Sequence, residues 1–362
     1  MKNLYKMPYR GKLVTGKVID RPNRFVLTAE VAGRVVSCYL ANPGRLWELI
    51  YPDAEVLLAP SSGKTEYVAL AARNFRGEVV PLHTHRANDL MAAVVDAGLL
   101  PRHVGARVLR REVTVGESRF DFLLREGGRE LYAEVKCCTL FAGRGAYFPD
   151  APSERAVRHL KHLCAMSRSG IRTALLMAVN SQTPQWFAPD WHTDPEFARA
   201  LMEARGDVEI IPMGFRWNDD LSVPPQVKSL PVKLETVRRQ MSGGGYCLAV
   251  LRREDVFRCV LQRSADLDED LKRWKRKKLP LPSWAKEFVG EGKLVALIPF
   301  RSSDFHDSEL RSEIDVLLDK KLIGEAGFWV GKFGRNPMRW PPFTAMILKE
   351  RFIRYDENFI SE

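Results

Sequence analysis

Apolar and polar residues alternate in short runs through the N-terminal part of the chain. Five runs fall at 11–19, 24–31, 34–40, 54–59 and 66–72, and glycine or proline separates them. A period of two is typical of strands that bury one face, and several short strands in succession suit a small barrel such as an OB-fold. The pattern predicts an OB-like β-barrel over residues 1–85, which either binds single-stranded nucleic acid or merely docks on the next domain.

Helix-like and strand-like patterns alternate through residues 86–234. The expected helices cover 90–97, 153–167 and 194–203, and the expected strands cover 118–124, 130–139, 172–179 and 208–213. Asn88 is the expected N-cap of the first helix and Gly98 its end, while Gly127-Gly128 favours a tight hairpin between the first two strands. This alternation predicts an α/β domain with a partly parallel sheet that helices cover.

The last third of the chain differs in character. Prolines mark residues 225–240 as an expected linker. Residues 241–362 are expected to form a separate α+β accessory domain of unknown function. A strand is expected at 246–251, before a charged helix that contains the basic run 272–278 around Trp274. Such a run favours a solvated helix face; the alternative is a phosphate-contacting patch in which Trp274 stacks on bases.

Basic residues exceed acidic ones. Lysine and arginine number 56 against 45 aspartates and glutamates, which gives a net charge of +11. That excess favours a polyanionic partner such as DNA, because cations near phosphates release condensed counterions. No apolar run approaches the roughly 20 residues that a membrane helix needs, and the first residues lack an apolar signal core. We therefore expect a cytoplasmic protein with no membrane partner, whose oligomeric state stays open.

One pair of expected strands carries acidic residues where the pattern calls for apolar ones. Asp121 is the lone acid in an apolar strand, and Glu134 and Lys136 lie in the next strand, two residues apart. A period of two places Glu134 and Lys136 on one face, and hairpin pairing can bring Asp121 to the same spot. The alternative is an exposed strand face with an incidental ion pair.

Two carboxylates and an ammonium at one point suit a particular chemistry. Mg²⁺ takes oxygen ligands and needs only one or two protein carboxylates, and Mn²⁺ can replace it. A divalent metal there would neutralise a phosphate and lower the pKa of an attacking water. The residues therefore predict a metal-dependent nuclease-type centre at Asp121, Glu134 and Lys136.

Five motifs along the chain resemble those of the sugar fermentation stimulation protein A (SfsA) family, in the same order. They are Asn23-Arg24-Phe25, Asn42-Pro43-Gly44-Arg45-Leu46, 118–124, Tyr132-Ala133-Glu134-Val135-Lys136 and 148–160. The resemblance covers about residues 10–234. It implies an OB-like domain followed by a PD-(D/E)XK restriction-nuclease-like domain over 86–234, and DNA as the partner.

The resemblance also implies roles for single residues. Asp121 and Glu134 would be the metal ligands, and Lys136 would orient or polarise the water. The residues it places against nucleic acid are Arg24, Arg45, Arg119, Arg155, Arg158 and His159.

The sequence departs from the family pattern at two of these places. Ala93 stands where the family's first helix of this domain carries a glutamate, and Asp96, about one turn later, is the expected substitute. Cys137 replaces an asparagine after the lysine. DNA binding survives such changes more easily than catalysis, so the alternative is a non-enzymatic DNA-binding regulator on a retired nuclease fold.

Other chemistry-bearing residues favour plainer interpretations. His83 and His85 have no third ligand nearby in the sequence, so packing is favoured, and His162 follows His159 by three residues on one helix face. The six cysteines are scattered without a CxxC pair, which argues against zinc and for reduced thiols. No sugar-binding pattern supports the sugar-metabolism enzyme that the family's name suggests.

The C-terminal domain is faintly similar to a GIY-YIG-like domain of unknown function. The similar segments are Gly245-Tyr246-Cys247-Leu248, 299–303, 308–310 and 327–331, and the catalytic Tyr-Val-Gly segment of such domains is not evident. Glu309 is the residue to test if this domain has an active site. We expect an interaction module instead.

Overall fold

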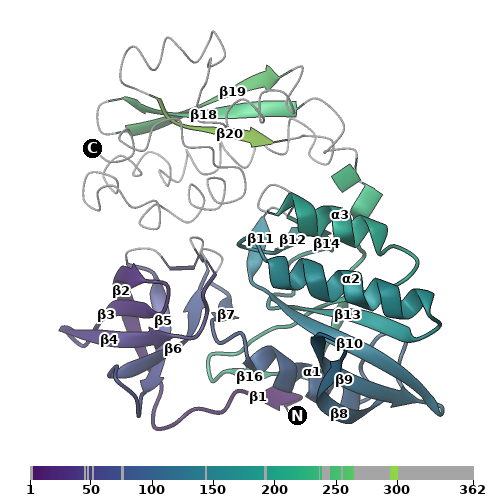
Figure 1. Cartoon of the computed structure of the whole chain (residues 1–362). Coiled ribbons are helices and arrows are strands. Elements are labelled where there is room, and N and C mark those ends of the chain that lie inside the picture. Colours follow the sequence, from purple (N-terminus) through teal and green to yellow (C-terminus); the bar gives the residue numbers. More distant parts are fainter. Residues whose placement is uncertain are drawn as a thin grey trace. The chain divides into compact units, whose positions relative to one another are not determined.

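The chain forms two compact units in the computed structural model (Figure 1). One unit holds residues 1–44 and 53–234, and the other holds residues 45–52 and 235–362. The structure describes residues 3–44, 46, 49–50, 53–74, 77–142, 145–190, 194–235 and 237–238, and the strands 245–253, 256–264 and 294–300.

The N-terminal strands of the first unit close into a barrel. The strands are β2 (Val14–Asn23), β3 (Val26–Val31), β4 (Arg34–Leu40), β5 (Glu55–Pro60), β6 (Tyr67–Arg73) and β7 (Val79–Pro81). They pair in the order β4-β3-β2-β5-β6-β7, and a parallel pairing of β4 with β6 closes the circle. Alternate residues such as Leu27, Ala29 and Leu40 are fully buried in its interior. The predicted OB-like barrel is confirmed.

A six-stranded mixed sheet forms the centre of the second domain. Its strands are β8 (Arg107–Val115), β9 (Ser118–Glu126), β10 (Arg129–Cys138), β13 (Arg172–Val179), β15 (Glu209–Gly214) and β17 (Lys228–Ser229). The order is β17-β15-β13-β10-β9-β8, with β8, β9 and β10 antiparallel and β10, β13 and β15 parallel. The predicted α/β domain with a partly parallel sheet is confirmed. The expected linker is wrong where β17 falls, because Lys228 and Ser229 pair with β15.

Three helices cover this sheet: α1 (Arg86–Asp96), α2 (Glu154–Arg168) and α3 (Pro195–Glu203). Figure 1 shows α2 and α3 on one side and α1 on the other. Alternate residues of β10 point to opposite faces of the sheet. Ala133 and Val135 pack in one core with α1, whereas Glu134 contacts α2.

The helix ends agree with the sequence except at one place. The side chains of Ser153 and Asp194 cap α2 and α3, and Gly98, with a φ of 69°, follows the C-cap of α1. Asn88 is not the N-cap of α1, because the helix already begins at Arg86. Its amide lies within the first turn, where it is free to bond to another element.

Further short strands tie distant parts of the first unit together. The first strand, β1 (Tyr5–Lys6), pairs antiparallel with β16 (Ser222–Val223). A separate sheet has the order β11-β12-β14, from β11 (Leu140–Ala142), β12 (Gly145–Phe148) and β14 (Trp186–Pro189). The chain thus returns to β1 before it adds β17 to the six-stranded sheet.

Three antiparallel strands are described in the second unit. They are β18 (Gly245–Arg253), β19 (Val256–Ser264) and β20 (Leu294–Phe300), in the order β19-β18-β20. The strand expected at 246–251 lies within β18. The basic run at 272–278 with Trp274, and Glu309, lie outside the described residues. In the part of the chain that the structure describes, no helix is long and apolar enough to cross a membrane.

Candidate metal and nucleic-acid site

The β9–β10 hairpin brings Asp121 beside Glu134. Its ladder pairs Ala133 with Phe122, so Asp121 and Glu134 are the next residues on the two strands. Beyond this pair a side chain replaces the backbone as hydrogen-bond acceptor: Asp121 Oδ2 accepts the backbone N–H of Val135 at 2.7 Å. The predicted convergence of these two strands on one point is what the structure shows.

The Asp121 carboxylate is held on both oxygens. Its Oδ1 accepts a hydrogen bond of 2.7 Å from the Asn88 amide on α1. Burial, and then the negative charge of Glu134, raise the pKa of Asp121 to about 6, although the two hydrogen bonds and Lys136 act against this. A carboxylate oxygen can accept more than one partner, so both oxygens of Asp121 remain able to ligate a cation.

Glu134 is fixed from one side only. It is 2% exposed, and its Oε1 lies 2.6 Å from both Lys136 Nζ and His159 Nδ1. Burial opposes ionisation of Glu134, but the His159 hydrogen bond and the Lys136 charge outweigh it and lower the pKa. Its Oε2 is buried and has no hydrogen-bond partner among the described residues. An unsatisfied buried carboxylate oxygen is costly unless something else binds it.

These residues fit a hard divalent cation. The described residues contain no group of three or more His, Cys, Asp or Glu side chains that could hold a metal ion. This cluster offers two carboxylates, those of Asp121 and Glu134, which act on each other through their charges. That number suits Mg²⁺, which keeps several waters and takes further oxygens from a phosphate. The donor set does not suit zinc, which prefers four nitrogen and sulfur ligands.

Helix α1 contributes an amide where an acid is expected. Asp96 is exposed at the end of α1, and Asn88 is the α1 residue that contacts Asp121. Sequence reasoning missed Asn88 because its position suggested a cap. The sequence carries no local signal for this role, because the bond to Asp121 depends on where α1 packs.

The predicted nucleic-acid residues lie in different surroundings. Arg155 and Arg158 are exposed on α2, and Arg119 is exposed on β9, where it pairs with Glu112 at 2.6 Å. His159 is buried against Glu134 instead of standing on the surface. Arg24 is exposed on the barrel, and Arg45 lies outside the described residues.

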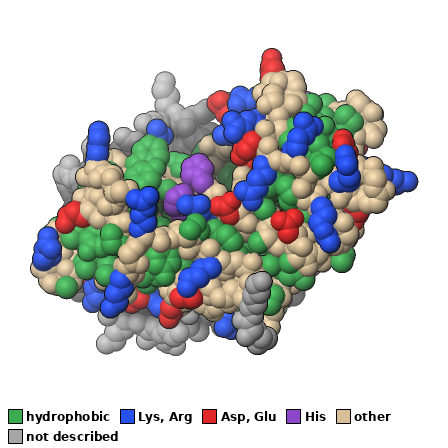
Figure 2. All heavy atoms as spheres, turned by 90° about the horizontal axis from the view of Figure 1, so that it is seen from below, with side chains coloured by type: hydrophobic (Ala, Val, Ile, Leu, Met, Phe, Trp, Pro, Cys, Tyr) green, Lys and Arg blue, Asp and Glu red, His purple; other side chains and the backbone are tan. Residues whose placement is uncertain are grey.

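The charge of the surface does not by itself mark a binding path. Figure 2 shows lysine and arginine side chains spread over one whole face, with acidic and hydrophobic side chains between them. Non-specific contacts with phosphates need only such scattered cations, whereas the reacting phosphate must be held at one point.

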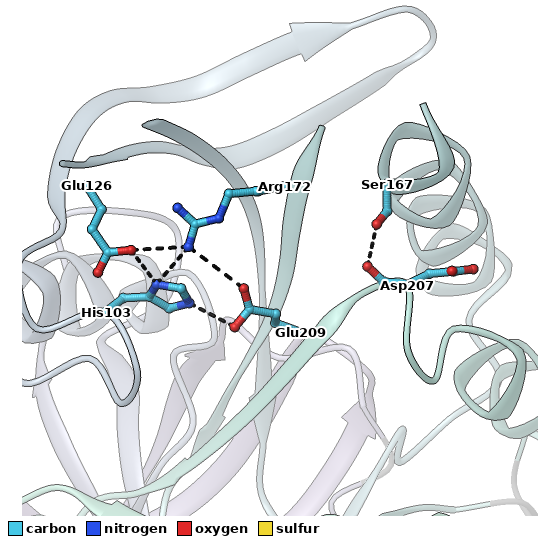
Figure 3. Close-up of polar contacts among 6 residues, drawn as sticks. All are labelled: His103, Glu126, Ser167, Arg172, Asp207 and Glu209. Carbon is cyan, nitrogen blue, oxygen red and sulfur yellow. Dashed lines mark hydrogen bonds and ion pairs between the residues drawn. The ribbon is translucent and has the colours of Figure 1, made fainter. Parts of the chain in front are cut away.

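A second charged cluster lies at the amino-terminal ends of the parallel strands β13 and β15 (Figure 3). His103 is 2% exposed, and its two ring nitrogens each lie 2.9 Å from a carboxylate oxygen, one of Glu126 and one of Glu209. Arg172, the first residue of β13, donates to Glu126 at 3.1 Å. Nearby, the Ser167 hydroxyl donates to the Asp207 carbonyl and ties α2 to the turn before β15. This cluster joins three strands of the sheet.

Comparisons with known proteins place this architecture in one family. A profile of the sugar fermentation stimulation protein RE domain matches residues 85–220, and a profile of the SfsA N-terminal OB domain matches residues 19–80. A sugar fermentation stimulation protein homolog of Moorella thermoacetica is 40% identical over 199 residues, which are 54% of this chain and 85% of the relative. One of Chloroflexus aurantiacus is 36% identical over 232 residues, which are 61% of this chain and 90% of the relative.

A solved structure agrees. The structure of Pyrococcus furiosus SfsA in complex with Ca²⁺ is 29% identical in sequence, with a TM-score of 0.58. The match covers 64% of this chain and 100% of that one. The resemblance seen in the motifs is therefore confirmed, and the chain belongs to the sugar fermentation stimulation protein (SfsA) family.

Proposed function

We propose that this protein binds DNA and hydrolyses phosphodiester bonds with a divalent metal held by Asp121 and Glu134. The observation that carries the proposal is the Glu134 carboxylate, which is almost fully buried, anchored through Oε1 and without a partner on Oε2. A buried charge in that state is typical of a site built for a cation.

Mg²⁺ or Mn²⁺ is the metal we propose. When bound, such an ion polarises a phosphate and lowers the pKa of its water. Asp121 and Glu134 would supply two oxygens, and the positive charge would offset the burial and the Glu134 repulsion that together raise the pKa of Asp121. The Ca²⁺ complex of the Pyrococcus furiosus protein supports a divalent cation, because calcium also takes oxygen ligands.

The remaining residues of the cluster have distinct roles in this proposal. Lys136 is largely buried, and its ammonium bonds to Glu134 Oε1, so it can orient a water or balance phosphate charge beside that carboxylate. His159 bonds to the same oxygen and is a positioning residue, because it fixes the direction of Oε2. The order Asp121, Glu134, Lys136 on a β-hairpin fits the PD-(D/E)XK pattern.

DNA is the proposed partner. The chain carries a net charge of +11, and Arg155 and Arg158 are exposed on the helix whose His159 contacts Glu134. Cations on that helix can hold the phosphates on either side of the reacting one. A DNA partner fits a cytoplasmic location, which we propose for this protein.

A second candidate keeps DNA binding and drops hydrolysis. Asn88 and Ala93 leave α1 without a carboxylate at the cluster, and both Asp121 oxygens already accept hydrogen bonds. A metal site with fewer protein charges binds its ion more weakly. This candidate makes the protein a DNA-binding regulator on a nuclease-like fold.

Cleavage of end-labelled single- and double-stranded DNA separates the two candidates. Wild type, Glu134→Gln and Asp121→Asn are incubated with EDTA, Mg²⁺ or Mn²⁺. Glu130→Gln is the matched control, because Glu130 is an exposed acid on the same strand. Hydrolysis predicts metal-dependent products from wild type and the control alone. Salt-sensitive binding by all four proteins without products supports the second candidate, and no binding at low salt overturns both.

A further inference from the structure

A polar cavity lies where the turn between β6 and β7 meets the segments that follow β13 and β15. Its volume is about 630 Å³, and residues 73, 77–79, 180–183 and 215–219 line it. Binding sites for small molecules and nucleotides commonly have this size and commonly lie beyond the carboxyl ends of parallel strands. The proposed hydrolysis does not use this cavity, so it is a candidate for a separate binding role.

One set of lining side chains is already bonded within the protein. Glu78 Oε1 accepts the hydroxyls of Ser181 at 2.8 Å and Thr183 at 2.6 Å, which ties the start of β7 to the segment after β13. Trp217 Nε1 donates to Asn180 Oδ1 at 3.0 Å, and Trp217 is almost fully buried. Because these groups satisfy one another, they shape the cavity and leave its selectivity to other side chains.

A second set of lining side chains keeps bonding capacity. Gln182 uses its amide nitrogen on a backbone carbonyl, and Asp219 uses Oδ1 on Arg73. Gln182 Oε1 and Asp219 Oδ2 accept no hydrogen bond from any residue in the described part of the chain. Arg216 is exposed and donates only one long bond, of 3.4 Å. The cavity therefore offers an occupant two acceptor oxygens and one guanidinium.

The formal charges of the lining cancel. Arg73 and Arg216 are balanced by Glu78 and Asp219, and the remaining polar side chains are amides and hydroxyls. A phosphate would meet as much repulsion as attraction here, so the cavity is unsuited to a further contact with the DNA backbone. The lining suits a neutral group that both donates and accepts hydrogen bonds, and a nucleobase is the neutral group that a DNA partner supplies.

Guanine is the base that matches the open groups. Its N1–H and N2–H₂ donors are adjacent and suit the free oxygens of Asp219 and Gln182, while its O6 and N7 acceptors suit the guanidinium of Arg216. The other bases do not combine two adjacent donor groups with a pair of acceptors. Phe215 and Trp217 add apolar surface to the lining, against which the rings of a base can pack.

Printed contacts along β10 join the cavity to the candidate metal site. Asn180, a lining residue, donates through Nδ2 to Cys137 Sγ at 3.1 Å, and Cys137 follows Lys136, which bonds to Glu134. Three residues of a strand span about 10 Å, so Cys137 lies roughly that far from Glu134. Because successive residues of β10 face opposite sides of the sheet, a base would pass the carboxyl ends of the strands to enter the cavity. This separation suits a nucleotide beside the one that is cut.

We infer that this cavity binds a guanine base that has left the duplex beside the phosphate held at Asp121 and Glu134. The inference rests on the proposed function for DNA as the source of the base. A base enters a cavity only after it has unpaired and unstacked, and a base that is already unpaired or mismatched does so at the smallest cost. The substrate class is therefore DNA that carries an unpaired or mismatched guanine.

Binding of duplexes that carry one bulged nucleotide tests the inference. Fluorescence anisotropy with EDTA present measures the dissociation constants of wild type for a bulged guanine, a bulged adenine, a bulged thymine and the fully paired duplex. A good bidentate contact discriminates between bases by roughly 5- to 150-fold, so the bulged guanine should bind more tightly than the other three duplexes by that factor. Equal affinity for all four duplexes would overturn the inference.

Two variants of the cavity and two matched controls locate the preference for guanine. Asp219→Ala and Arg216→Ala should each reduce it by roughly fivefold or more, because each removes one side of the contact. Glu196→Ala and Arg199→Ala remove the same two charges from an exposed pair on α3 that does not line the cavity, and they should keep the preference. The readout is a ratio of affinities, so a general loss of charge or of folded protein does not imitate the result. Survival of the preference in both cavity variants, or its loss in the controls, would contradict the assignment.

Further measurements separate this inference from a free ligand and from the proposed function. Calorimetric titration with guanosine monophosphate tests a free nucleotide as the occupant; its binding without any preference among the duplexes would overturn DNA as the source. If wild type prefers the bulged guanine but cleaves nothing with Mg²⁺, the base-binding cavity stands and hydrolysis fails. If wild type cleaves all four duplexes with Mg²⁺ but binds them equally, hydrolysis stands and the base-binding cavity fails.

Discussion

The α/β domain contains two buried charged clusters that differ in one respect. His103 has a carboxylate on each ring nitrogen, and Arg172 joins the same group. Glu134 is equally buried, yet one of its oxygens has no partner among the described residues. The first cluster is complete within the protein, and the second keeps a buried carboxylate oxygen that a cation could bind.

This difference teaches how to separate a structural ion network from a binding site. Desolvating charges costs several kcal/mol per ion, by order of magnitude, and only good partners compensate for it. At His103 the partners come from the ends of β9, β13 and β15, so the network stabilises the fold. At Glu134 the compensation is incomplete, so the site gains most when a cation binds.

The largest expected effect is on the rate of DNA cleavage, which should depend on the Glu134 cluster and not on the His103 cluster. Glu134→Gln should reduce the rate of metal-dependent DNA cleavage by roughly 100-fold or more, because a metal contributes several kcal/mol to charge stabilisation in such reactions. The rate constants are measured under single-turnover conditions. Glu126→Gln, at the complete cluster, should leave them within about twofold. A similar loss in both variants would erase the distinction.

The next effect concerns stability. His103→Ala should lower the free energy of unfolding by about 2–3 kcal/mol, because it leaves two partly buried carboxylates close together without the imidazole that lies between them. Urea denaturation measures this change. The increase in Tm that Mg²⁺ causes should persist in this variant and vanish in Glu134→Gln. Loss of the Mg²⁺ effect in His103→Ala would mean that the two clusters are coupled.

The two clusters should respond to pH in opposite directions. Asp121 has a folded pKa of about 6, above its ordinary value, so its contribution to metal-free stability falls as pH rises toward 6. Glu126 has its pKa lowered, chiefly by the His103 hydrogen bond, so its contribution is present above its ordinary pKa and is lost as pH falls.

Metal binding makes the first of these responses measurable. Mg²⁺ must displace the proton on Asp121, so the Tm increase with Mg²⁺ should grow between about pH 5 and pH 7. Thermal denaturation with and without Mg²⁺ across this range gives the curve. Asp121→Asn should flatten it. An Mg²⁺ effect of equal size at both ends of the range would contradict the assignment of Asp121 as a ligand.

The smallest expected effect concerns the binding of DNA near the Glu134 cluster. Arg155→Ala and Arg158→Ala should each weaken DNA binding modestly and reduce its salt dependence by about one counterion per arginine. Titrations at several salt concentrations give the slope. Arg168→Ala on the same helix is the control, because Arg168 already pairs with Asp207. An unchanged slope for the first two variants would remove α2 from the interface.

Local patterns predicted much of this structure. Alternation with a period of two gave the barrel strands, and it placed Asp121, Glu134 and Lys136 together, since a hairpin joins neighbours in sequence. Ser153 and Asp194 are where the second and third helices were expected to begin, and each caps its helix, because a helix start depends on three or four adjacent residues.

Contacts between distant segments escaped prediction. His103 and Glu209 lie 106 residues apart, and no periodic pattern relates them. Asn88 was assigned to a cap because its bond to Asp121 depends on where α1 packs. His159 was expected on phosphate, and its burial against Glu134 depends on how α2 lies on the sheet. The parallel pairing of β4 with β6 was equally invisible, since each strand alone shows only its own alternation.

The pairing of β1 with β16 bears on how the molecule is made. Lys6 bonds to Asp220, 214 residues later, so a nascent chain cannot pair β1 with β16 until nearly all of the first unit has been synthesised. The barrel can close much sooner, because its strands are near neighbours. Pairing of β1 is therefore a late event in the assembly of this unit, and a protease that cuts in this segment should act on chains still being synthesised far more readily than on finished ones.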